Sequence, residues 1–386
     1  PGTPGAASLE AARAFFSSLP EGSAVMIKAL AGGGGRGIRM VKSLSAIDEA
    51  YERCVSEALA AFGQGEVYVE QLVRKPRHIE VQIVGDGTHA IHLGERDCTL
   101  QRRNQKIVEV APCPNLSPRL RDELTGAAVR LAREAGYDSL GTFEFLVDGG
   151  APGGQGFVFM EANPRLQVEH TVTEEVTGVD LVRAQLEIAS GRSLRDLGIT
   201  EGVSDNCGYA IEMRINTETM GAGGSTGPEG GTLSVYEVAS GPGVRVDGCG
   251  YTGYTINPAF DSLLAKLIVT SRSGRYEDAV AKACRALSEF RIEGVATNLP
   301  FLRGLLRRPE VALNDIHTRF IEDNAAALAE PLDEHKAAFS GRLPSGKASP
   351  RDDGARNAPV GTVPVGSPMQ GRVVSLEVAA GDAVAA

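Results

Sequence analysis

The stretch "FMEANPRLQVEH", residues 159–170, follows an apolar run with regularly spaced polar residues. From residue 161 onward every second residue is polar, in the order Glu161, Asn163, Arg165, Gln167 and Glu169. Residues two apart in an extended chain point to the same face. The pattern therefore predicts a row of two carboxylates, two amides and one guanidinium along one face of an extended segment.

A predicted β-hairpin joins this stretch to the segment before it. "SLGTFEFLVD" (139–148) and "GFVFMEAN" (156–163) are separated by a Gly/Pro turn. Glu144 lies inside the first apolar strand, where a lone glutamate is costly unless it is paired or metal-bound. Pairing of the strands would bring Glu144, Glu161 and Asn163 together as oxygen ligands that suit Mg²⁺ and nucleotide phosphates. The alternative is an outward-facing pair of glutamates on a half-solvated sheet.

The loop "AGGGGRG" (31–37) is a second candidate site, between predicted strands 23–30 and 38–43. Glycines let backbone N–H groups approach phosphate oxygens, and Lys28 and Arg36 add positive charge. The loop is neither a Walker A sequence nor a dinucleotide-binding fingerprint, because it lacks the required pattern and does not open a helix. A flexible hairpin tip is the alternative interpretation.

Several charged residues have both a chemical and an ordinary interpretation. Arg165 suits a planar oxyanion or phosphate and Glu169 suits a general base, although a surface salt-bridge ladder is the alternative. The charged run 94–112 is, taken alone, typical of a solvated loop. Arg245 is unremarkable in isolation, and His78 on an amphipathic strand is more often structural than functional.

Composition sets the class of protein. The chain has 386 residues, of which 42% are hydrophobic and 23% charged, typical of a soluble globular protein with two or three domains. Its net charge of −10 argues against nucleic acid or an anionic membrane as partner. The sequence shows neither a membrane-spanning run nor a secretory signal. Its six cysteines include no C-x-x-C pair, so a zinc site or disulfide framework is not indicated and a reducing, cytoplasmic location fits best.

Hydrophobic periodicity predicts a mixed α+β fold. Helices are expected at 8–18, 44–62, 119–136, 179–190 and 276–289. Further strands are expected at 66–73, 207–214, 232–238 and 263–270, with a hairpin at 78–97. The apolar pattern then fades into a polar linker. The last 21 residues resume strand patterning but contain too few strands to bury a face by themselves.

Four segments, in this order and spacing, resemble the biotin carboxylase component of the biotin-dependent carboxylases, an ATP-grasp family. They are "IKALAGGGGRGIRMV" (27–41), "RKPRHIEVQIVGDGTHAIHLGERDCTLQRRNQKIVEVAP" (74–112), "GTFEFLVD" (141–148) with "FMEANPRLQVEHTVTEEVTGVDLV" (159–182), and "PAFDSLLAKLIV" (258–269). The resemblance implies an ATP-grasp lid subdomain at 1–75, a central antiparallel-sheet subdomain at 76–205, a biotin carboxylase C-terminal subdomain at 206–325, a linker at 326–365 and an incomplete biotinyl-carrier-like segment at 366–386.

The resemblance also implies carboxylation of biotin by ATP, Mg²⁺ or Mn²⁺ and bicarbonate, through carboxyphosphate. The residues expected around ATP are Lys28, Gly34, Gly35, Glu70, Gln71, Val73, His78, Gln101 and Asn104. The residues expected to carry the metal are Glu144, Glu161 and Asn163. Bicarbonate would be held by Lys106, Arg165, Gln167 and Val168. Glu169 would remove the bicarbonate proton, and Arg245 would stabilise the biotin enolate.

The chain departs from the family pattern in three places. Position 104 is Asn where some members have His. The family's N-terminal subdomain, with another ATP-binding lysine, is not found, and the segment "SPMQGRVVSLEVAAGDAV" (367–384) resembles only the opening of a biotinyl carrier domain. We therefore expect biotin on a carrier lysine outside this chain.

The expected partners are a biotinyl carrier domain and a carboxyltransferase, within a homo-oligomeric, single-chain acyl-CoA carboxylase. The alternatives are another ATP-grasp carboxylate–amine ligase and a truncated nucleotide-binding fragment.

Overall fold

The computed structural model describes residues 1–31, 37–73, 75–148, 156–199, 208–220, 226–228 and 230–328. The chain divides into two units, residues 1–332 and 333–386. The whole second unit lies outside the described residues, and so do most of the predicted linker and the carrier-like segment. Gly34, Gly35 and Arg36 of the glycine loop also lie outside them.

The first 72 residues contain a small antiparallel sheet of order β2-β1-β3. Its strands are β1 (Val25–Ala29), β2 (Ile38–Val41) and β3 (Val67–Gln71). Alternate strand residues pack against helices α1 (Leu9–Ser18) and α2 (Ile47–Phe62). Ser8 caps α1 as the sequence predicts, because its Oγ accepts a hydrogen bond of 3.2 Å from the backbone N–H of Ala11. The predicted helix 44–62 begins as a short 3₁₀ turn, η1 (Leu44–Ala46).

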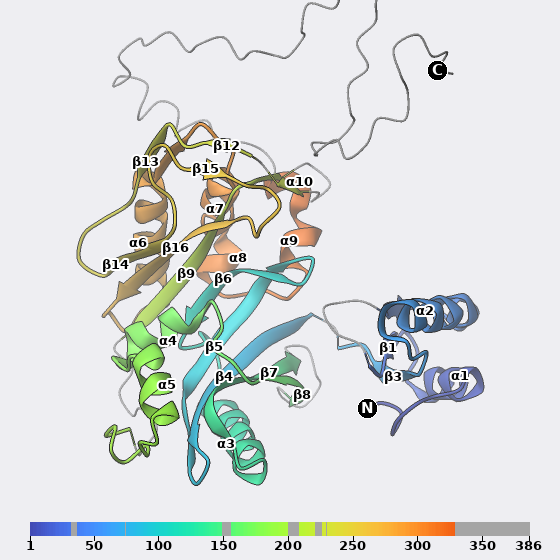
Figure 1. Cartoon of the computed structure of the whole chain (residues 1–386). Coiled ribbons are helices and arrows are strands. Elements are labelled where there is room, and N and C mark those ends of the chain that lie inside the picture. The colour runs from blue at the N-terminus through green and yellow to red at the C-terminus, as the bar shows by residue number, and fades with distance from the viewer. Residues whose placement is uncertain are drawn as a thin grey trace, which may run out of the picture. The chain divides into compact units, whose positions relative to one another are not determined.

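A second, antiparallel sheet of eight strands has the order β14-β16-β9-β6-β5-β4-β7-β8 (Figure 1). Its strands are β4 (Pro76–Asp86), β5 (Ala90–Arg102), β6 (Gln105–Ala111), β7 (Asp138–Asp148), β8 (Gly156–Asn163), β9 (Tyr209–Asn216), β14 (Val244–Gly248) and β16 (Leu263–Ser271). Strands of the predicted central and C-terminal subdomains thus share one sheet. The predicted boundary near residue 206 falls among residues that the structure does not describe, so it stays a prediction.

The remaining elements surround this sheet. The helices are α3 (Pro118–Glu134), α4 (His170–Thr177), α5 (Leu181–Ala189), α6 (Tyr276–Glu289), α7 (Leu299–Leu306), α8 (Pro309–Ala312), α9 (Phe320–Asp323) and α10 (Ala325–Leu328). The short strands are β10 (Glu218–Met220), β11 (Thr226–Pro228), β12 (Gly231–Thr232), β13 (Val235–Glu237), β15 (Thr255–Ile256) and β17 (Arg291–Glu293). None of the helices in the described ranges is long and apolar enough to cross a membrane.

The two faces of the large sheet have different chemistry. Odd-numbered residues such as Ile79 and Phe143 pack beneath α3, and Ile211 and Leu267 belong to the core that includes α6 and α7. The alternate residues of these strands and of the neighbouring β6 include charged groups that are nevertheless buried, among them Glu80, Glu109, Glu144 and Glu212. Helix α4 packs on this polar face with Val172 and Val176. Because successive strand residues alternate in direction, one sheet supplies an apolar core and a charged interior.

The structure confirms the helices expected at 8–18, 119–136, 179–190 and 276–289, within one or two residues at their ends.

The prediction for the charged run 94–112, taken alone, was wrong. It forms β5 and β6, and Arg96 is fully buried. Charged residues of this run can be buried because its cations, such as Arg96 and Lys106, pair with carboxylates from other strands. The expected strand 232–238 is divided into β12 and β13, and α4 and α7 to α10 were not predicted.

The expectation for the row 159–170 was correct only in its first part. Strand β8 ends at Asn163, and α4 begins at His170. The chain therefore turns between them instead of remaining extended. A register shift between Glu144 and Phe145 also interrupts the β7–β8 pairing, where Glu144 still lies opposite Glu161.

Close packing beside the β4–β5 hairpin allows a test of this fold. A Cβ added to Gly85 of β4 would lie 2.1 Å from the carbonyl oxygen of Tyr137, after α3. We expect Gly85→Ala to lower the free energy of unfolding by about 1–3 kcal/mol, the usual effect of overpacking. Urea unfolding measures the change. Gly274→Ala is the control, since a Cβ there meets nothing within 4 Å. Equal stability of both variants would contradict the packing described.

Candidate active site

The ammonium of Lys106 joins three carboxylates from distant parts of the chain. Its Nζ lies 2.5 Å from Glu80 Oε2, 3.0 Å from Glu144 Oε1 and 2.6 Å from Glu169 Oε1. These residues come from β6, β4, β7 and the residue before α4. Burial alone would lower the pKa of Lys106, but the three carboxylates, Glu80 most of all, raise it well above its ordinary value. Lys106 is therefore a permanent cation.

Glu80 is shared between two cations. Arg96 Nε donates to Glu80 Oε1 at 2.5 Å, and both side chains are fully buried. Burial favours the neutral acid, but Lys106 and Arg96 outweigh it and lower the pKa of Glu80 to about 2. Arg96 is itself fixed by Gln82 at 2.7 Å and Thr173 at 2.9 Å. Glu80 was not among the predicted site residues, and Arg96 was predicted only as part of the charged run 94–112.

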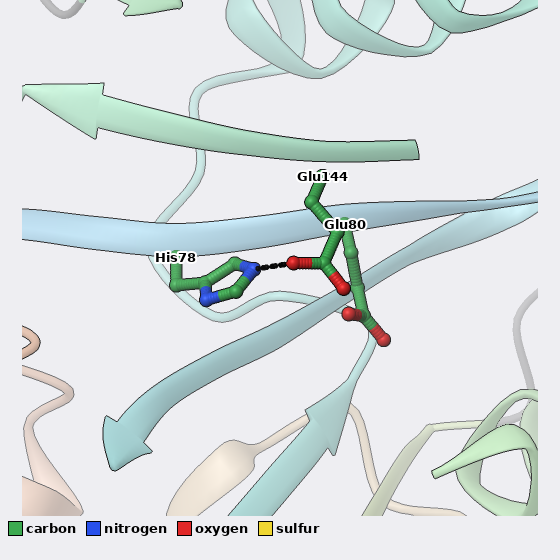
Figure 2. A group of neighbouring side chains, drawn as sticks. All are labelled: His78, Glu80 and Glu144. Carbon is green, nitrogen blue, oxygen red and sulfur yellow. Dashed lines mark ion pairs between the residues drawn. The ribbon is translucent and has the colours of Figure 1, made fainter. Parts of the chain in front are cut away.

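Glu144 receives donors from four sides. Figure 2 shows the His78 ring directed at Glu144, with Glu80 beside them, and His78 Nε2 lies 2.9 Å from Glu144 Oε2. Asn163 Nδ2 and Gln167 Nε2 each donate to Glu144 Oε1 at 3.0 Å. Burial raises the pKa of Glu144, but the hydrogen bond from His78 and the charge of Lys106 lower it to about 2. Glu144 is an anion across the physiological pH range.

The predicted metal ligands come together as the hairpin argument expected. Asn163 Nδ2 donates to Glu144 Oε1 at 3.0 Å and to Glu161 Oε1 at 3.2 Å, and the side chain of Glu161 is exposed. The ligand atoms of His78, Glu80 and Glu144 also lie within 4.8 Å of one another. Two carboxylates and an amide oxygen are hard ligands that fit Mg²⁺ or Mn²⁺.

A second cluster, of Glu80, Cys98 and Glu169, has similar spacing. Lys106 already contacts both of its carboxylates. Burial raises the pKa of Cys98 well above its ordinary value, so its sulfur is a thiol. This second cluster is therefore a poor metal site.

Glu169 is held at both oxygens. Lys106 contacts Oε1, and Arg214 of β9 contacts Oε2 at 3.0 Å. Arg214 Nε donates in turn to Glu109 Oε1 at 2.6 Å. Sequence reasoning missed Arg214, although the alternation of "IEMRIN" (211–216) could have indicated a buried charged row. The carboxylate predicted as the base is thus fixed between an ammonium and a guanidinium.

The turn that carries Glu169 is held by the large sheet. Lys266 Nζ of β16 donates to the carbonyl of Val168 at 2.7 Å and to Thr171 Oγ1 at 3.3 Å. Gln167 bonds Glu144 in β7. These bonds place the predicted residues Gln167, Val168 and Glu169 next to Lys106, even though the extended row ends earlier.

Two predicted arginines do not contact this cluster in the part of the chain that the structure describes. Arg165 is exposed and donates to the Leu166 carbonyl at 3.2 Å. Arg245 pairs with Asp247 at 2.9 Å and with Glu174 at 3.0 Å. It lines a separate cavity of about 450 Å³ with His170, Glu174, Glu175 and Asp180. The arginine that contacts Glu169 is Arg214, not Arg245.

The predicted nucleotide residues are found in two groups. Lys28 of β1 pairs with Glu70 of β3, and the predicted Gln71 and Val73 lie at the end of β3 and beyond it. Gln101 hydrogen-bonds the other ring nitrogen of His78. Asn104 is exposed in the β5–β6 turn, with a left-handed φ of 64°. These contacts are compatible with a nucleotide site.

Comparison with known proteins now identifies the fold. Residues 1–197 match the family model of the carbamoyl-phosphate synthase L chain ATP-binding domain, and residues 212–323 match that of the biotin carboxylase C-terminal domain. The chain belongs to the biotin carboxylase family. Its ATP-grasp biotin carboxylase fold agrees with the class predicted from the sequence.

Solved structures and a curated relative agree with this assignment. The biotin carboxylase domain of 2-oxoglutarate carboxylase from Hydrogenobacter thermophilus, in complex with MgADP, ADP and bicarbonate, is 39% identical with a TM-score of 0.77, covering 86% of this chain and 71% of that one. A single-chain, multi-domain long-chain acyl-CoA carboxylase is 46% identical with a TM-score of 0.63, covering 67% and 28%.

Pyruvate carboxylase 1 of Caenorhabditis elegans is also 46% identical over 326 residues. That match covers 84% of this biotin carboxylase chain but only 27% of the relative. The chain thus spans about a quarter of the length of the curated relatives that it matches.

Lys106 offers a test of the cluster that needs no turnover. We expect Lys106→Met to lower the free energy of unfolding at neutral pH by about 3–5 kcal/mol, because it leaves buried carboxylates unpaired. In the wild type, Glu80 and Glu144 have depressed pKa values of about 2, so their stabilisation is present above pH 4.5 and is lost as the pH falls toward 2. Without Lys106 that stabilisation is absent, so the difference between the two proteins should shrink in acid.

Denaturant unfolding at several pH values measures this difference. Arg119→Met, which breaks an exposed ion pair with Glu123, should leave stability unchanged and serves as the control. A loss for Lys106→Met that is the same at every pH would show that charge is not its cause.

Proposed function

We propose that this chain catalyses the ATP- and bicarbonate-dependent carboxylation of biotin, with release of ADP and phosphate. The observation that carries the proposal is Lys106, which lies against both the candidate metal ligand Glu144 and the candidate base Glu169. The Hydrogenobacter thermophilus relative, in complex with MgADP and bicarbonate, supports it. The first half-reaction of a biotin-dependent carboxylase is thus the function that this geometry supports best.

The residues divide the chemistry between them. Glu169 takes the proton of bicarbonate while a bicarbonate oxygen bonds the γ-phosphorus and ADP leaves, which gives carboxyphosphate. Lys106 stabilises the negative charge that develops on oxygen, and Gln167 and the Val168 backbone help to orient the bicarbonate. Glu144, Glu161 and Asn163 would hold Mg²⁺ or Mn²⁺, which neutralises phosphate charge. The C–O bond between the carboxyl carbon and phosphate then breaks, the carboxyl carbon bonds biotin N1, and the released phosphate takes up the N1 proton.

The nucleotide residues complete the proposal. Lys28, Gly34 and Gly35 would hold ATP phosphates, and Glu70, Gln71 and Val73 would line the adenine site. His78, Gln101 and Asn104 would lie around the nucleotide, and Arg165 would bind anionic substrate. Gln101 hydrogen-bonds one ring nitrogen of His78, and the other ring nitrogen lies 2.9 Å from Glu144. Their place beside a candidate metal ligand fits a role near the phosphates.

The acceptor of the carboxyl group is a finer proposal. We favour an acyl-CoA, because the carrier-like segment follows after a short linker and the long-chain acyl-CoA carboxylase is 46% identical. Pyruvate is the alternative, since the Caenorhabditis elegans pyruvate carboxylase has the same identity. With either acceptor, we propose a biotinyl carrier domain and a carboxyltransferase as partners. We also propose that the enzyme is homo-oligomeric and cytoplasmic.

ATP cleavage tests the half-reaction. We expect phosphate release by the chain, joined to a family N-terminal segment, to rise only when Mg²⁺, bicarbonate and free biotin are all present. Glu169→Gln should lower this rate by about 10²–10⁴-fold, because the amide cannot accept the proton. Arg165→Ala should lower it as well if Arg165 binds the anion.

The controls separate binding from chemistry in this assay. Calorimetric titration with MgATP should give the same affinity for the wild type and Glu169→Gln, which shows that the variant is folded. ATP cleavage that is indifferent to biotin would instead favour an ATP-grasp ligase with another acceptor. Nucleotide binding without any cleavage would favour a nucleotide-binding fragment.

A matched pair of variants decides which arginine faces the reaction. Arg214 contacts Glu169, whereas Arg245 contacts Asp247 and Glu174. We expect Arg214→Met to lower kcat by about 10²–10³-fold, as loss of a fixed cation beside developing charge does. Arg245→Met should have the smaller effect on kcat. Steady-state kinetics in biotin and bicarbonate measures both, and a larger loss for Arg245→Met would restore the assignment made from the sequence.

A further inference from the structure

Two fully buried glutamates lie in the large sheet close to Arg214, and they have no role in the proposed reaction. Glu109 of β6 and Glu212 of β9 are directly opposite each other in the antiparallel register, and both are 0% exposed. Side chains in such cross-strand positions have Cβ atoms about 4.5–5.5 Å apart. Two ionised carboxylates at this spacing in a dry interior repel strongly, so the pair needs an explanation.

Each carboxyl group has one bonded oxygen and one unbonded oxygen. Glu109 Oε1 accepts from Arg214 Nε at 2.6 Å, and Glu212 Oε2 accepts from the Thr171 hydroxyl. Glu109 Oε2 and Glu212 Oε1 are buried and have no hydrogen-bond partner within the described part of the chain. Buried polar atoms are nearly always satisfied, so two orphans on facing side chains indicate a missing proton between them.

The charges around the pair favour one proton. Five buried carboxylates form the connected network, namely Glu80, Glu144, Glu169, Glu109 and Glu212. Four cations face them, namely Arg96, Lys106, Arg214 and Lys266. A further cation, Arg245, is paired with Glu174 and with Asp247, and Asp247 also lies 3.9 Å from Lys266. Within the set of five carboxylates and four cations, one proton on a carboxyl group balances the charge.

The contacts also show which glutamate carries the proton. Glu109 has a charge-assisted bond to Arg214, which stabilises its ionised form. The cation nearest to Glu212 is Lys266, whose Nζ lies 3.8 Å from Oε2 and bonds the Val168 carbonyl instead. A proton on Glu212 Oε1 would be donated to Glu109 Oε2, which satisfies both orphaned atoms at once.

We propose that Glu212 is a neutral carboxylic acid that donates a hydrogen bond to Glu109, and that the pair positions Arg214 against Glu169. The positioning role rests on the proposed function, whereas the protonation of Glu212 does not. Burial, reinforced by the charge of Glu109, raises the pKa of Glu212 to about 8. Burial likewise raises the pKa of Glu109, to about 7, although Arg214 opposes the shift. Both directions agree with one shared proton at neutral pH.

The proton on Glu212 keeps the Arg214 guanidinium in contact with Glu169. Arg214 bonds Glu109 through Nε and Glu169 through a terminal nitrogen, so its fork spans two carboxylates. Ionisation of Glu212 would add a second negative charge on the Glu109 side and draw Arg214 away from Glu169. The other charged groups that face the pair are Lys266 and Lys106. Glu109 and Glu212 therefore act as positioning residues through Arg214.

Infrared spectroscopy tests the protonation without any turnover. At pH 7 the folded chain should show a carbonyl-stretch band of a protonated carboxylic acid, which disappears in Glu212→Gln. Glu95→Gln is the matched control, because Glu95 is also buried but is paired with Arg121 at 2.7 Å. That control should keep the band. A wild-type spectrum without the band, or a band that survives in Glu212→Gln, would overturn the proposal.

Stability against pH gives a second readout of the same proton. The folded pKa of Glu212, about 8, exceeds the ordinary value of 4.5, so ionisation opposes folding. This cost is absent below pH 4.5, grows as the pH rises toward 8 and is then constant. Glu212→Gln should therefore gain stability relative to the wild type across this window. A difference that does not change with pH would contradict a raised pKa.

Kinetics tests the positioning role. Glu212→Gln retains a donor and an acceptor, so kcat should stay within about twofold, an effect too small to count as lost transition-state stabilisation. Glu212→Met and Glu109→Gln should lower kcat by about 10- to 100-fold, as a small misplacement of a fixed group does, while the affinity for MgATP is unchanged. Above pH 8 the wild type should lose activity that Glu212→Gln retains.

The infrared and stability results test the protonation of Glu212 independently of the proposed biotin carboxylase activity. If no variant cleaves ATP in a biotin-dependent way, the infrared and stability results still decide whether Glu212 is protonated. If Glu212→Gln loses as much activity as Glu212→Met, or Glu109→Gln keeps full activity, the positioning role is wrong.

Discussion

The ion pairs of Lys106 with Glu80, Glu144 and Glu169 are the constraint on which the rest of the site depends. The carboxylates come from two strands and a turn, so the site exists only when the large sheet is correctly registered. One ammonium cannot neutralise three buried carboxylates, and Arg96 and Arg214 supply the remaining positive charge. Such a network is costly to bury, and removal of one partner leaves a buried charge unpaired.

The sheet can accommodate the buried charges because successive side chains alternate between an apolar face and a charged face. Ile79, Val81 and Phe143 supply the core under α3, while Glu80 and Glu144 point to the other face. A slip of one residue in β4 would place Glu80 in the apolar core, so burial of charge fixes the register strongly. The strands of residues 209–271 extend the same charged face with Glu212, Arg214 and Lys266.

Local patterning was enough to predict part of the site. Glu144, Glu161 and Asn163 could be placed together because a hairpin with a short turn fixes which residues face each other. The same reasoning failed for Arg165, because nothing in the alternation shows that β8 ends at Asn163. Arg214 and Glu80 could not be assigned locally, since their partners lie 45 and 26 residues away along the chain. Charge in a buried strand resembles charge in a solvated loop until its partners are known, which explains the error for residues 94–112.

The three donors of Lys106 have a consequence for the proposed chemistry. An ammonium has three N–H groups, and each already lies near a carboxylate in this structure. A bicarbonate that binds Lys106 must therefore replace one carboxylate. Glu80 remains bonded to Arg96, and Glu144 to His78, Asn163 and Gln167. Glu169 also keeps a second cation, Arg214, so it can give up Lys106 without being left unpaired. Its Oε1 would then face the incoming acid with a free lone pair, and binding of the substrate would itself make the base available.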